Sequence, residues 1–339
     1  MADTFETVWD LPRIELRPLD GLRETRPCAV LAGEKSWAVV GALLPRWPIV
    51  VQAEPPSADK KYLDMLADSL PQHVEVIYGI GGGRVADAAK YVAWKNKRPA
   101  VIIPTTLSVD GFFTALAALR DDGSVYYANT GPAERVIVDM DVVSGAPPHI
   151  RGTGIVEILS MTTGLLDWKY AADRGKNSYQ ERFQPWAASI AAGIAQQAYK
   201  IAAGVGAGRA DALRNLLDLM CVEVQLTNQL GHNRPQEGSE QYFAYAIERR
   251  AVRGKSLPYA DLVGPGILVA AAMHGQNIAP IRDTLRSAGV RLNQLRKEDI
   301  IATLRELPDY VQRHNLPYSI VHDFQPTEAN IARVLEGWI

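Results

Sequence analysis

Apolar runs alternate with amphipathic stretches along the first 150 residues of the chain. Runs of strand length predict strands at residues 14–19, 27–33, 48–57, 74–80, 99–106 and 134–143. Segments with helical spacing lie between them, at residues 34–47, 58–70 and 83–94. Strands separated by helices of about 10–15 residues indicate βαβ units and a parallel sheet with helices on both faces.

The pattern changes after residue 154 and is mostly helical from there to the end of the chain. This part is rich in Ala, Leu and Gln, with breaks expected near Pro235, Pro258 and Pro317. The predicted fold class is therefore α/β with two domains. Residues 1–150 form a Rossmann-like parallel-sheet domain of the nucleotide-binding type, and residues 151–339 form an all-helical substrate domain.

The composition is that of a soluble globular protein, with 47% hydrophobic and 22% charged residues and a formal net charge of −2. This balance argues against nucleic acid as a partner, because proteins that bind it usually carry a basic excess. No apolar stretch reaches the ~18 residues that a membrane span needs, and the first residues lack the features of a signal peptide. Cys28 and Cys221 stand far apart in apolar contexts, which favours free thiols. We expect a cytoplasmic protein without a membrane partner.

A glycine-rich segment at residues 78–93, YGIGGGRVADAAKYVA, closes a strand and opens a helix. Glycines at such a turn let the backbone approach a ligand and direct free N–H groups and the helix dipole at it, which suits a pyrophosphate. The spacing, Gly79-x-Gly81-Gly82-Gly83, differs from the usual G-x-G-x-x-G. Taken alone, the segment is also compatible with a tight turn that binds nothing.

Further motifs follow this turn in order: IPTTLSVDG at 103–111, VIVDMDVV at 136–143 and APPHIRGTG at 146–154. Together with the glycines they resemble the superfamily of iron-containing alcohol dehydrogenases, glycerol dehydrogenase and dehydroquinate synthase. Segments 233–248 and 316–336 are similar to its sn-glycerol-1-phosphate dehydrogenase branch. The resemblance covers residues 27–336 and implies the dehydroquinate-synthase-like fold.

The resemblance also implies a nucleotide cofactor, NAD or NADP, between which the sequence does not decide. The pyrophosphate would lie on the glycines, and polar residues would line the dinucleotide site, which gives the set Gly81, Gly82, Gly83, Asp87, Thr105, Thr106 and Ser108. Asp110 matches the family's aspartate, which lies in the cleft between domains and contacts substrate hydroxyls. Without the resemblance, the threonines could equally be strand-end caps and Asp110 an ordinary turn residue.

In this superfamily an acidic residue and two histidines hold a zinc or iron ion, which polarises the substrate oxygen. Glu157, in GTGIVEILS, stands at the acidic position and resembles the synthase form of the motif. Gln241 and Tyr259, 18 residues apart, stand where the two ligand histidines are expected, and Tyr245 replaces a further family histidine. An amide and a phenol are poor ligands for a transition metal. We therefore expect no metal cofactor.

Three functions remain open on these residues. The first is an NAD(P)-dependent dehydrogenase of a small polyol, keto sugar or its phosphate that works without metal, with Tyr259 or Tyr245 as general acid or base. Glu157 would orient a hydroxyl, and Asp110 and Gln241 complete the candidate catalytic set. The second is a cyclase or lyase of the dehydroquinate-synthase type, which the context of Glu157 favours. The third is a non-catalytic dinucleotide-binding homologue.

Cationic and imidazole side chains near these segments are candidates for binding a substrate phosphate or carboxylate: His232, Arg234, Arg253, Lys255 and His274. Arg253 and Lys255 are equally well explained as solvated surface charges. The expected partner is thus a small molecule. Whether the chain forms a homodimer is left open by the sequence.

Overall fold

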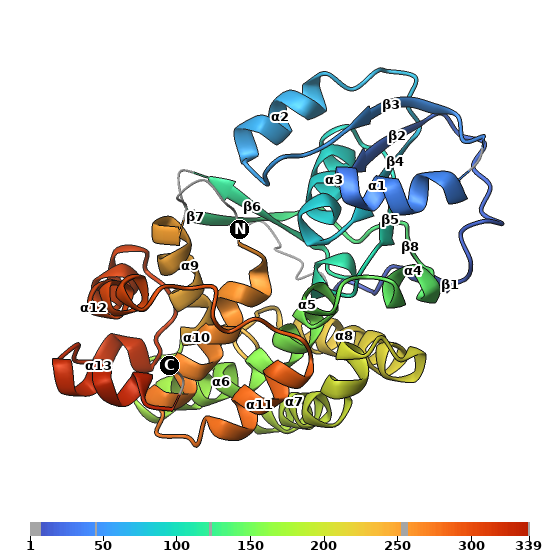
Figure 1. Cartoon of the computed structure of the whole chain (residues 1–339). Helices are drawn as coiled ribbons and strands as arrows, with labels where there is room; N and C mark the ends of the chain where they lie inside the picture. Colours follow the sequence, from blue (N-terminus) through green and yellow to red (C-terminus); the bar gives the residue numbers. More distant parts are fainter. Residues whose placement is uncertain (1–7, 45, 122–123, 252–256, 338–339) are drawn as a thin grey trace. The chain divides into compact units, whose positions relative to one another are not determined.

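The computed structural model describes residues 8–44, 46–121, 124–251 and 257–337. It divides the chain into two units, Met1–Ala146 and Pro147–Ile339, and each is described by itself. The first unit contains a parallel sheet and the second is helical, as the predicted fold class requires (Figure 1). Arg253 and Lys255, two of the candidate anion-binding residues, lie outside the described residues.

Six parallel strands make up the sheet of the first unit, in the order β1-β8-β5-β4-β2-β3. They are β1 (Arg13–Leu16), β2 (Cys28–Ala32), β3 (Ile49–Ala53), β4 (Val76–Gly81), β5 (Ala100–Pro104) and β8 (Arg135–Val138). The helices between them are α1 (Glu34–Val40) with the short η1 (Gly41–Leu43), α2 (Lys60–Asp68) and α3 (Gly83–Lys95). Strand β4 is buried along its whole length, which explains its continuous apolar run.

The two faces of the sheet pack against different helices. Tyr78 of β4 lies in an apolar cluster with Val40, the last residue of α1, and with Trp47. Its neighbour Gly79 points to the opposite face, because side chains alternate along a strand. A Cβ at Gly79 would lie 2.7 Å from the Cβ of Ala89 in α3. The glycine therefore lets α3 pack directly on the strand from which it starts.

Strand β8 is shorter than the predicted strand at 134–143. It ends at Val138, and helix α4 (Met140–Ser144) follows. Asp139 is the reason, because its Oδ1 accepts a bond from the N–H group of Asp141 at 3.0 Å and so caps the first turn of a helix. The prediction is therefore wrong for the second half of this run.

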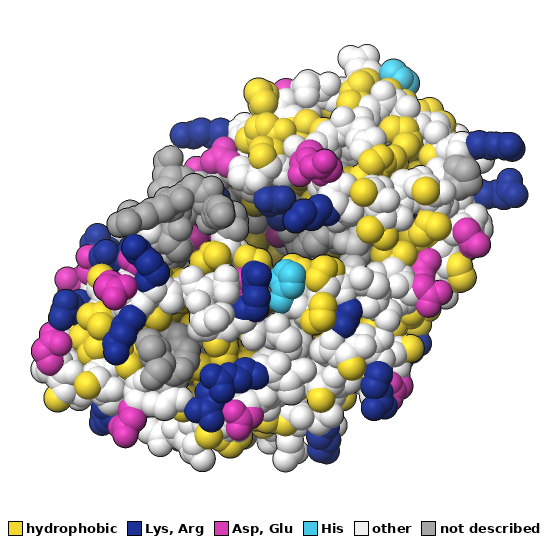
Figure 2. Space-filling model, viewed as in Figure 1, with side chains coloured by type: hydrophobic (Ala, Val, Ile, Leu, Met, Phe, Trp, Pro, Cys, Tyr) yellow, Lys and Arg dark blue, Asp and Glu magenta, His cyan; other side chains and the backbone are white. Residues whose placement is uncertain are grey.

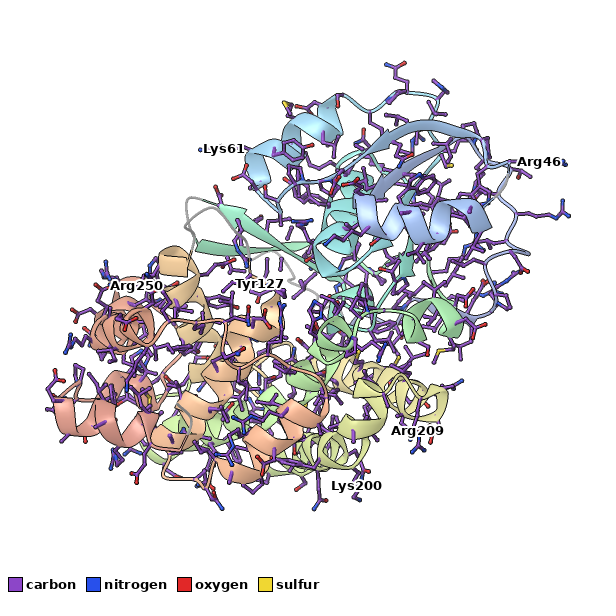
Figure 3. All side chains as sticks on the ribbon, viewed as in Figure 1. Arg46, Lys61, Tyr127, Lys200, Arg209 and Arg250 are labelled. Carbon is purple, nitrogen blue, oxygen red and sulfur yellow. The ribbon has the colours of Figure 1, made fainter. Side chains whose placement is uncertain are left out.

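A two-stranded antiparallel hairpin, absent from the sequence prediction, follows β5. Its strands are β6 (Leu116–Asp121) and β7 (Ser124–Asn129). Strand β6 packs against α3, and so does the short helix η2 (Asp110–Phe112) that precedes it. Tyr127 of β7 is exposed and is labelled in Figure 3. The hairpin thus extends the contact of residues 110–121 with α3.

The second unit consists of helices joined by short connections. They are α5 (Pro148–Arg151), α6 (Thr153–Asp173), α7 (Pro185–Gly206), α8 (Ala210–Leu230), α9 (Ser239–Ala251), α10 (Tyr259–Met273), α11 (Ala279–Ser287), α12 (Lys297–Arg313), η3 (Ile320–Asp323) and α13 (Glu328–Leu335). A Cβ at Gly164 of α6 would lie 2.7 Å from Pro235 O, and one at Gly266 of α10 would collide with Glu240 O. Both glycines therefore allow close packing around the start of α9.

The surface carries mixed charge. Acidic and basic side chains are interspersed on the face shown in Figure 2, in keeping with a formal net charge of −2. Over the part of the chain that the structure describes, no helix combines the length and the apolar character that crossing a membrane requires.

A buried carboxylate gives the first unit a measurable acid sensitivity. Glu24 accepts bonds from Tyr78 Oη (2.6 Å) and Arg26 Nη2 (2.9 Å). Burial alone would raise its pKa, but the bonds from Arg26 and Tyr78 lower the pKa of Glu24 from 4.5 to about 2. Its contribution to stability is therefore present above pH 4.5 and is lost as the pH falls towards 2.

Glu24→Gln is expected to lower the free energy of unfolding by about 2–3 kcal/mol at pH 7. The deficit should shrink between pH 4.5 and pH 2, where the wild-type carboxylate takes up its proton. Urea unfolding at pH 7 and pH 3 measures both effects. Glu75→Gln, at an exposed position of the same unit, is the matched control. An equal loss of stability in both variants would contradict the assignment.

Candidate functional site

The glycine turn lies between the last residue of β4, Gly81, and the first of α3, Gly83. The fold itself explains both of these glycines. Gly81 has a φ of +151°, which side chains rarely adopt, and a Cβ at Gly83 would lie 2.6 Å from Val109 Cγ2. Gly82 differs, because its φ of −89° suits any residue and the nearest atom to its Cβ position is Ser108 Oγ at 3.8 Å. Packing gives no reason for a glycine at position 82.

The first N–H groups of α3 have no partner within the helix, as at every helix N-terminus. No side chain caps this helix, whose N-cap is Gly82. The open space at Gly82 and these N–H groups together form a cradle that suits a phosphate. A side chain at position 82 would fill the cradle without disturbing the fold.

Polar residues at the end of β5 lie beside this cradle. The N–H of Thr105 donates to Gly81 O at 3.1 Å, and its Oγ1 lies 3.2 Å from Ser36 Oγ. Thr106 and Ser108 are buried in the same segment. The structure therefore brings together Gly81, Thr105 and Ser108, three of the predicted cofactor residues.

Asp87, another predicted cofactor residue, lies one turn further along α3. Its Oδ1 is 3.6 Å from Lys90 Nζ, and it accepts a bond from the backbone N–H of Ala118. Burial raises the pKa of Asp87 to about 6, with a smaller contribution from the charge of Asp110. Asp110 itself is half-buried at the start of η2. The candidate substrate residue Asp110 is thus electrostatically coupled to Asp87 and Lys90.

In the second unit, two residues of the candidate catalytic set are in direct contact. Gln241, in the first turn of α9, donates through Nε2 to the hydroxyl of Tyr259, the first residue of α10. Glu157 is buried on α6, a helix that packs against both α9 and α10. Tyr245, one turn after Gln241, donates to Glu237 Oε1 at 2.9 Å. The amide–phenol pair is therefore the central feature of this candidate site.

A buried acidic network, absent from the sequence prediction, lies at the start of α9. Asp167 of α6 is fully buried and accepts bonds from His274 Nε2 (2.9 Å), Ile320 N (2.9 Å) and Ser239 N (2.7 Å). Burial alone would raise its pKa, but the bond from His274 and these N–H groups lower the pKa of Asp167. The network ties α6, α9, α10 and η3 together. His274, predicted to bind substrate, is a member of it.

Glu240 is a second fully buried acid and directly precedes Gln241. Its Oε1 accepts from Gly238 N at 2.6 Å, and its Oε2 lies 2.7 Å from Thr163 Oγ1. The hydroxyl of Thr163 also lies 3.1 Å from Ser160 O. Burial, and then the charge of Asp167, raise the pKa of Glu240 to about 8. The carboxyl therefore keeps its proton at neutral pH.

The other candidate substrate residues also lie inside the second unit. Arg234 is 3% exposed and donates to Tyr318 O at 2.7 Å. His232 Nδ1 accepts from the N–H of Arg234 at 3.3 Å. Burial, and then the charge of Arg234, lower the pKa of His232 to about 4, so its ring is neutral at neutral pH. Arg234 and His232 thus fix the connection between α8 and α9.

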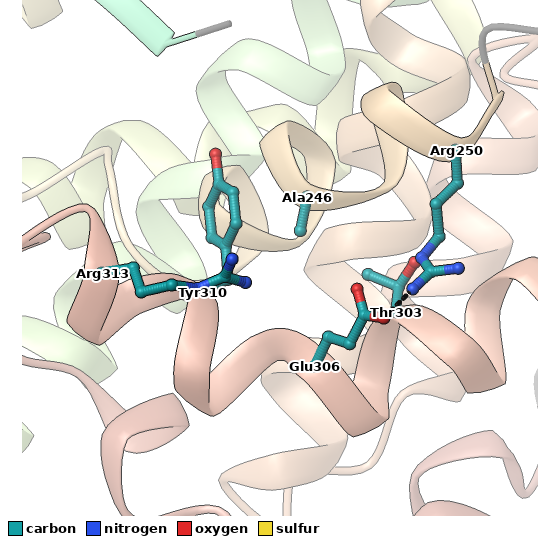
Figure 4. Close-up of a pocket in the computed structure, with 6 residues that line it drawn as sticks. All are labelled: Ala246, Arg250, Thr303, Glu306, Tyr310 and Arg313. Carbon is teal, nitrogen blue, oxygen red and sulfur yellow. Dashed lines mark ion pairs between the residues drawn. The ribbon is translucent and has the colours of Figure 1, made fainter.

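A pocket of about 280 Å³ lies between α9 and α12 (Figure 4). Arg250 and Glu306 form an ion pair in it. Its walls are formed by Ala246, Arg250, Thr303, Glu306, Tyr310 and Arg313. None of these residues belongs to the candidate set derived from the sequence.

The sequence of this chain is similar to those of known dehydrogenases. A family model described as iron-containing alcohol dehydrogenase matches residues 23–147. A glycerol-1-phosphate dehydrogenase (NAD(P)+) of Thermofilum pendens is 33% identical over 230 residues, which are 66% of this chain and 64% of the relative. That of Aeropyrum pernix is 30% identical over 230 residues, which are 68% of this chain and 64% of the relative.

Solved structures share the fold over nearly the whole chain. A probable glycerol dehydrogenase from Sinorhizobium meliloti has a TM-score of 0.70 at 18% identity, covering 96% of this chain and 97% of its own. The 2-epi-5-epi-valiolone synthase of Streptomyces hygroscopicus has a TM-score of 0.66 at 15% identity, covering 99% and 98%. This chain is thus similar in sequence to iron-containing alcohol dehydrogenases over residues 23–147, and it shares its fold with the solved structures.

These similarities confirm the predicted resemblance and the dehydroquinate-synthase-like fold. The aligned part spans less than two thirds of the length of the curated relatives, 64% in both cases. Their activity is therefore a proposal for this chain and not a conclusion from the similarity.

The resemblance implies a divalent metal, and the chemistry of the side chains present decides whether one would fit. Gln241 directs an amide N–H at the oxygen of Tyr259. The Gln241 amide could offer a metal only its neutral oxygen, and both a neutral amide oxygen and a neutral phenol are weak ligands for a transition metal. Among the described residues, no group of three or more His, Cys, Asp and Glu is arranged to hold a metal ion. The donor set at Gln241 and Tyr259 does not fit a zinc or iron ion.

Proposed function

We propose that this protein is an NAD(P)-dependent oxidoreductase that acts on a small polyol, a keto sugar or its phosphate. The observation that carries the proposal is the cradle at Gly82, where neither backbone conformation nor packing requires a glycine. A dinucleotide pyrophosphate explains it, because the backbone must then come close to the phosphates. Curated relatives named glycerol-1-phosphate dehydrogenase (NAD(P)+) make glycerol 1-phosphate the first substrate to test.

In this proposal Gly81, Gly82 and Gly83 bind the pyrophosphate, and Thr105, Thr106, Ser108 and Asp87 line the rest of the cofactor site. When bound, the nicotinamide supplies or accepts the hydride. Asp110 binds a substrate hydroxyl. His232, Arg234 and His274 shape the helical unit around the catalytic residues, and their predicted contact with substrate stays a prediction.

Tyr259 is the proposed proton donor to the carbonyl oxygen during reduction and the acceptor during oxidation. The Gln241 amide N–H donates to its oxygen and so stabilises the negative charge that develops there as the proton leaves. Tyr245 is the alternative donor, although its hydroxyl is bonded to Glu237. Glu157, buried on the adjoining helix, orients a substrate hydroxyl. Reduction thus converts ketone, NAD(P)H and one proton into alcohol and NAD(P)+.

The proposed chemistry needs no metal, because the tyrosine hydroxyl takes the role that a Lewis acid has in the superfamily. We also propose a cytoplasmic protein without nucleic acid or membrane as a partner. We propose a homodimer as the assembly of the active enzyme.

The test uses purified full-length protein with NADH or NADPH and dihydroxyacetone phosphate, and with NAD+ or NADP+ and glycerol 1-phosphate. Turnover is expected in both directions and unchanged after EDTA treatment, with elemental analysis showing much less than one zinc or iron per chain. One tightly held metal per chain, with loss of activity in EDTA, would contradict the metal-independent mechanism. Enhanced NADH fluorescence without any turnover would instead favour the non-catalytic homologue.

A further inference from the structure

A buried lysine on α3, Lys90, lies among backbone carbonyls in the first unit. Its side chain is 1% exposed. Its Nζ donates to Gly111 O (2.7 Å), to Thr114 O (3.3 Å) and to Leu116 O. Asp87 Oδ1 lies 3.6 Å from the same nitrogen. The ammonium group therefore uses all three of its hydrogens inside the protein.

Burying an ammonium group is costly unless it is hydrogen-bonded and paired. Burial lowers the pKa of Lys90, and the carboxylates of Asp87 and Asp110 oppose that shift. The three carbonyls reach one nitrogen because η2 and the turn after it fold residues 110–116 back over α3. The conformation of this segment thus depends on the positive charge at its centre.

The clamped segment begins with Asp110. The carbonyl of Asp110 accepts a bond from Phe113 N at 2.7 Å, and the side chain of Phe113 is fully buried. The next carbonyl along the chain, Gly111 O, is the one bonded to Lys90 at 2.7 Å. Asp110 is therefore held from both sides, by the turn that follows it and by the lysine beneath it.

We propose that Lys90 is a positioning residue for substrate binding, which fixes segment 110–116 and so holds Asp110 in place for a substrate hydroxyl. The inference rests on the proposed function in assigning Asp110 to the substrate. Lys90 acts through this segment and not on the substrate, because its donors are already engaged with Gly111, Thr114 and Leu116. Helix α3 then serves two tasks, with the glycine cradle at its start and the clamp two turns later.

Lys90→Met tests the clamp, since it keeps the length of the side chain and removes its charge and donors. Amide hydrogen exchange at Phe113 and in its peptide is expected to become about 10-fold faster. Exchange at Thr105, whose N–H is bonded to Gly81 O, should not change. The KM for the polyol or ketone is expected to rise about 10-fold, while the Kd for NAD(P)H changes less than about 2-fold.

Lys95→Met is the matched control. Lys95 lies on the same helix but is 38% exposed and pairs with Asp64 at 3.2 Å. It should leave exchange in segment 110–116 and the KM unchanged. A purely structural role for Lys90 would reduce the amount of folded enzyme, and hence kcat per mole of protein, without raising the KM.

Unchanged exchange in segment 110–116 would overturn the clamp, whatever the activity. Faster exchange with an unchanged KM would overturn the positioning role. If the wild-type protein turns over no polyol or ketone, the substrate role fails together with the proposed function, and exchange alone then decides the clamp.

A second pair of variants serves if Lys90→Met does not fold. Thr114→Val removes a hydroxyl that lies 3.4 Å from Lys90 Nζ and donates to Leu116 O at 3.0 Å, and it leaves the charge in place. Thr114→Ser keeps the hydroxyl and is its control. Faster exchange and a higher KM in the valine variant alone would support the clamp, and equal behaviour of the two variants would refute it.

Discussion

Gly82→Val is expected to fold normally and to bind NAD(P)H at least about 100-fold more weakly than the wild type, as measured by calorimetry or by NADH fluorescence. The backbone of Gly82 is in an extended conformation that valine accepts, and its Cβ would lie 3.8 Å from the nearest atom, Ser108 Oγ. The branched side chain would instead occupy the space that the proposed pyrophosphate needs. Gly82 is therefore the glycine of this turn at which ligand binding and folding can be separated.

Gly193→Val is the matched control, because a Cβ at this position of α7 would meet nothing within 4 Å. It should leave nucleotide affinity unchanged. Circular dichroism and thermal unfolding should show both variants folded. If the folded Gly82→Val protein binds NAD(P)H with wild-type affinity, the glycines form only a tight turn. The main observation in favour of the proposed function would then be lost.

The double variant Gln241→His/Tyr259→His is expected to gain zinc binding and to lose about 100–1000-fold in turnover. The side chains at 241 and 259 already meet, so two imidazoles there would lie close together. With Glu157 on the adjoining helix they would supply the carboxylate–His–His donor set of a catalytic zinc site. The zinc affinity should be about 10–100-fold below that of a native site, because the partners that orient ligand histidines are missing. Turnover falls because the proposed proton donor is gone.

Two further variants separate these effects. Tyr259→Phe removes the hydroxyl alone and should lose the same activity without gaining zinc. Adding Glu157→Gln to the double variant should abolish the new zinc site, as measured by elemental analysis after dialysis. A folded double variant that binds no zinc and keeps full turnover would show that Gln241 and Tyr259 lie outside the catalytic site.

The sheet could be predicted from the sequence because its central strands β2, β4 and β5 are buried apolar runs that end at a Gly or Pro. The hairpin was missed although the sequence holds a signal for it, the Asp-Gly dipeptide at 122–123 between two alternating runs. The helix after Val138 was missed because Asp139, which caps it, stands inside an apolar run. Local capping chemistry there outweighs the hydrophobic pattern.

The candidate site was only partly accessible to sequence reasoning. Family spacing placed Gln241 and Tyr259 at the positions of the two ligand histidines, and their contact at the starts of α9 and α10 is known only from the structure. The bonds of Asp167 join residues up to 153 positions apart, which no local pattern encodes. The sequence signal for such a buried polar group is a charged residue among the apolar residues of a helix. Lys90 in α3 and Asp167 in α6 are both of this kind.

The hydrogen bonds of the Thr163 hydroxyl indicate the protonation state of Glu240. The hydroxyl has one hydrogen to donate, yet two oxygens, Glu240 Oε2 and Ser160 O, lie within hydrogen-bonding distance of it. A protonated Glu240 resolves the count, since it donates to Thr163, which then donates to Ser160. Because burial raises the pKa of Glu240 from 4.5 to about 8, this carboxyl holds a proton in the folded chain that it has lost in the unfolded chain within that range. Through Glu240, folding at neutral pH takes up a proton, and the contribution of this carboxyl to the stability of the helical unit is lost as the pH rises from 4.5 towards 8.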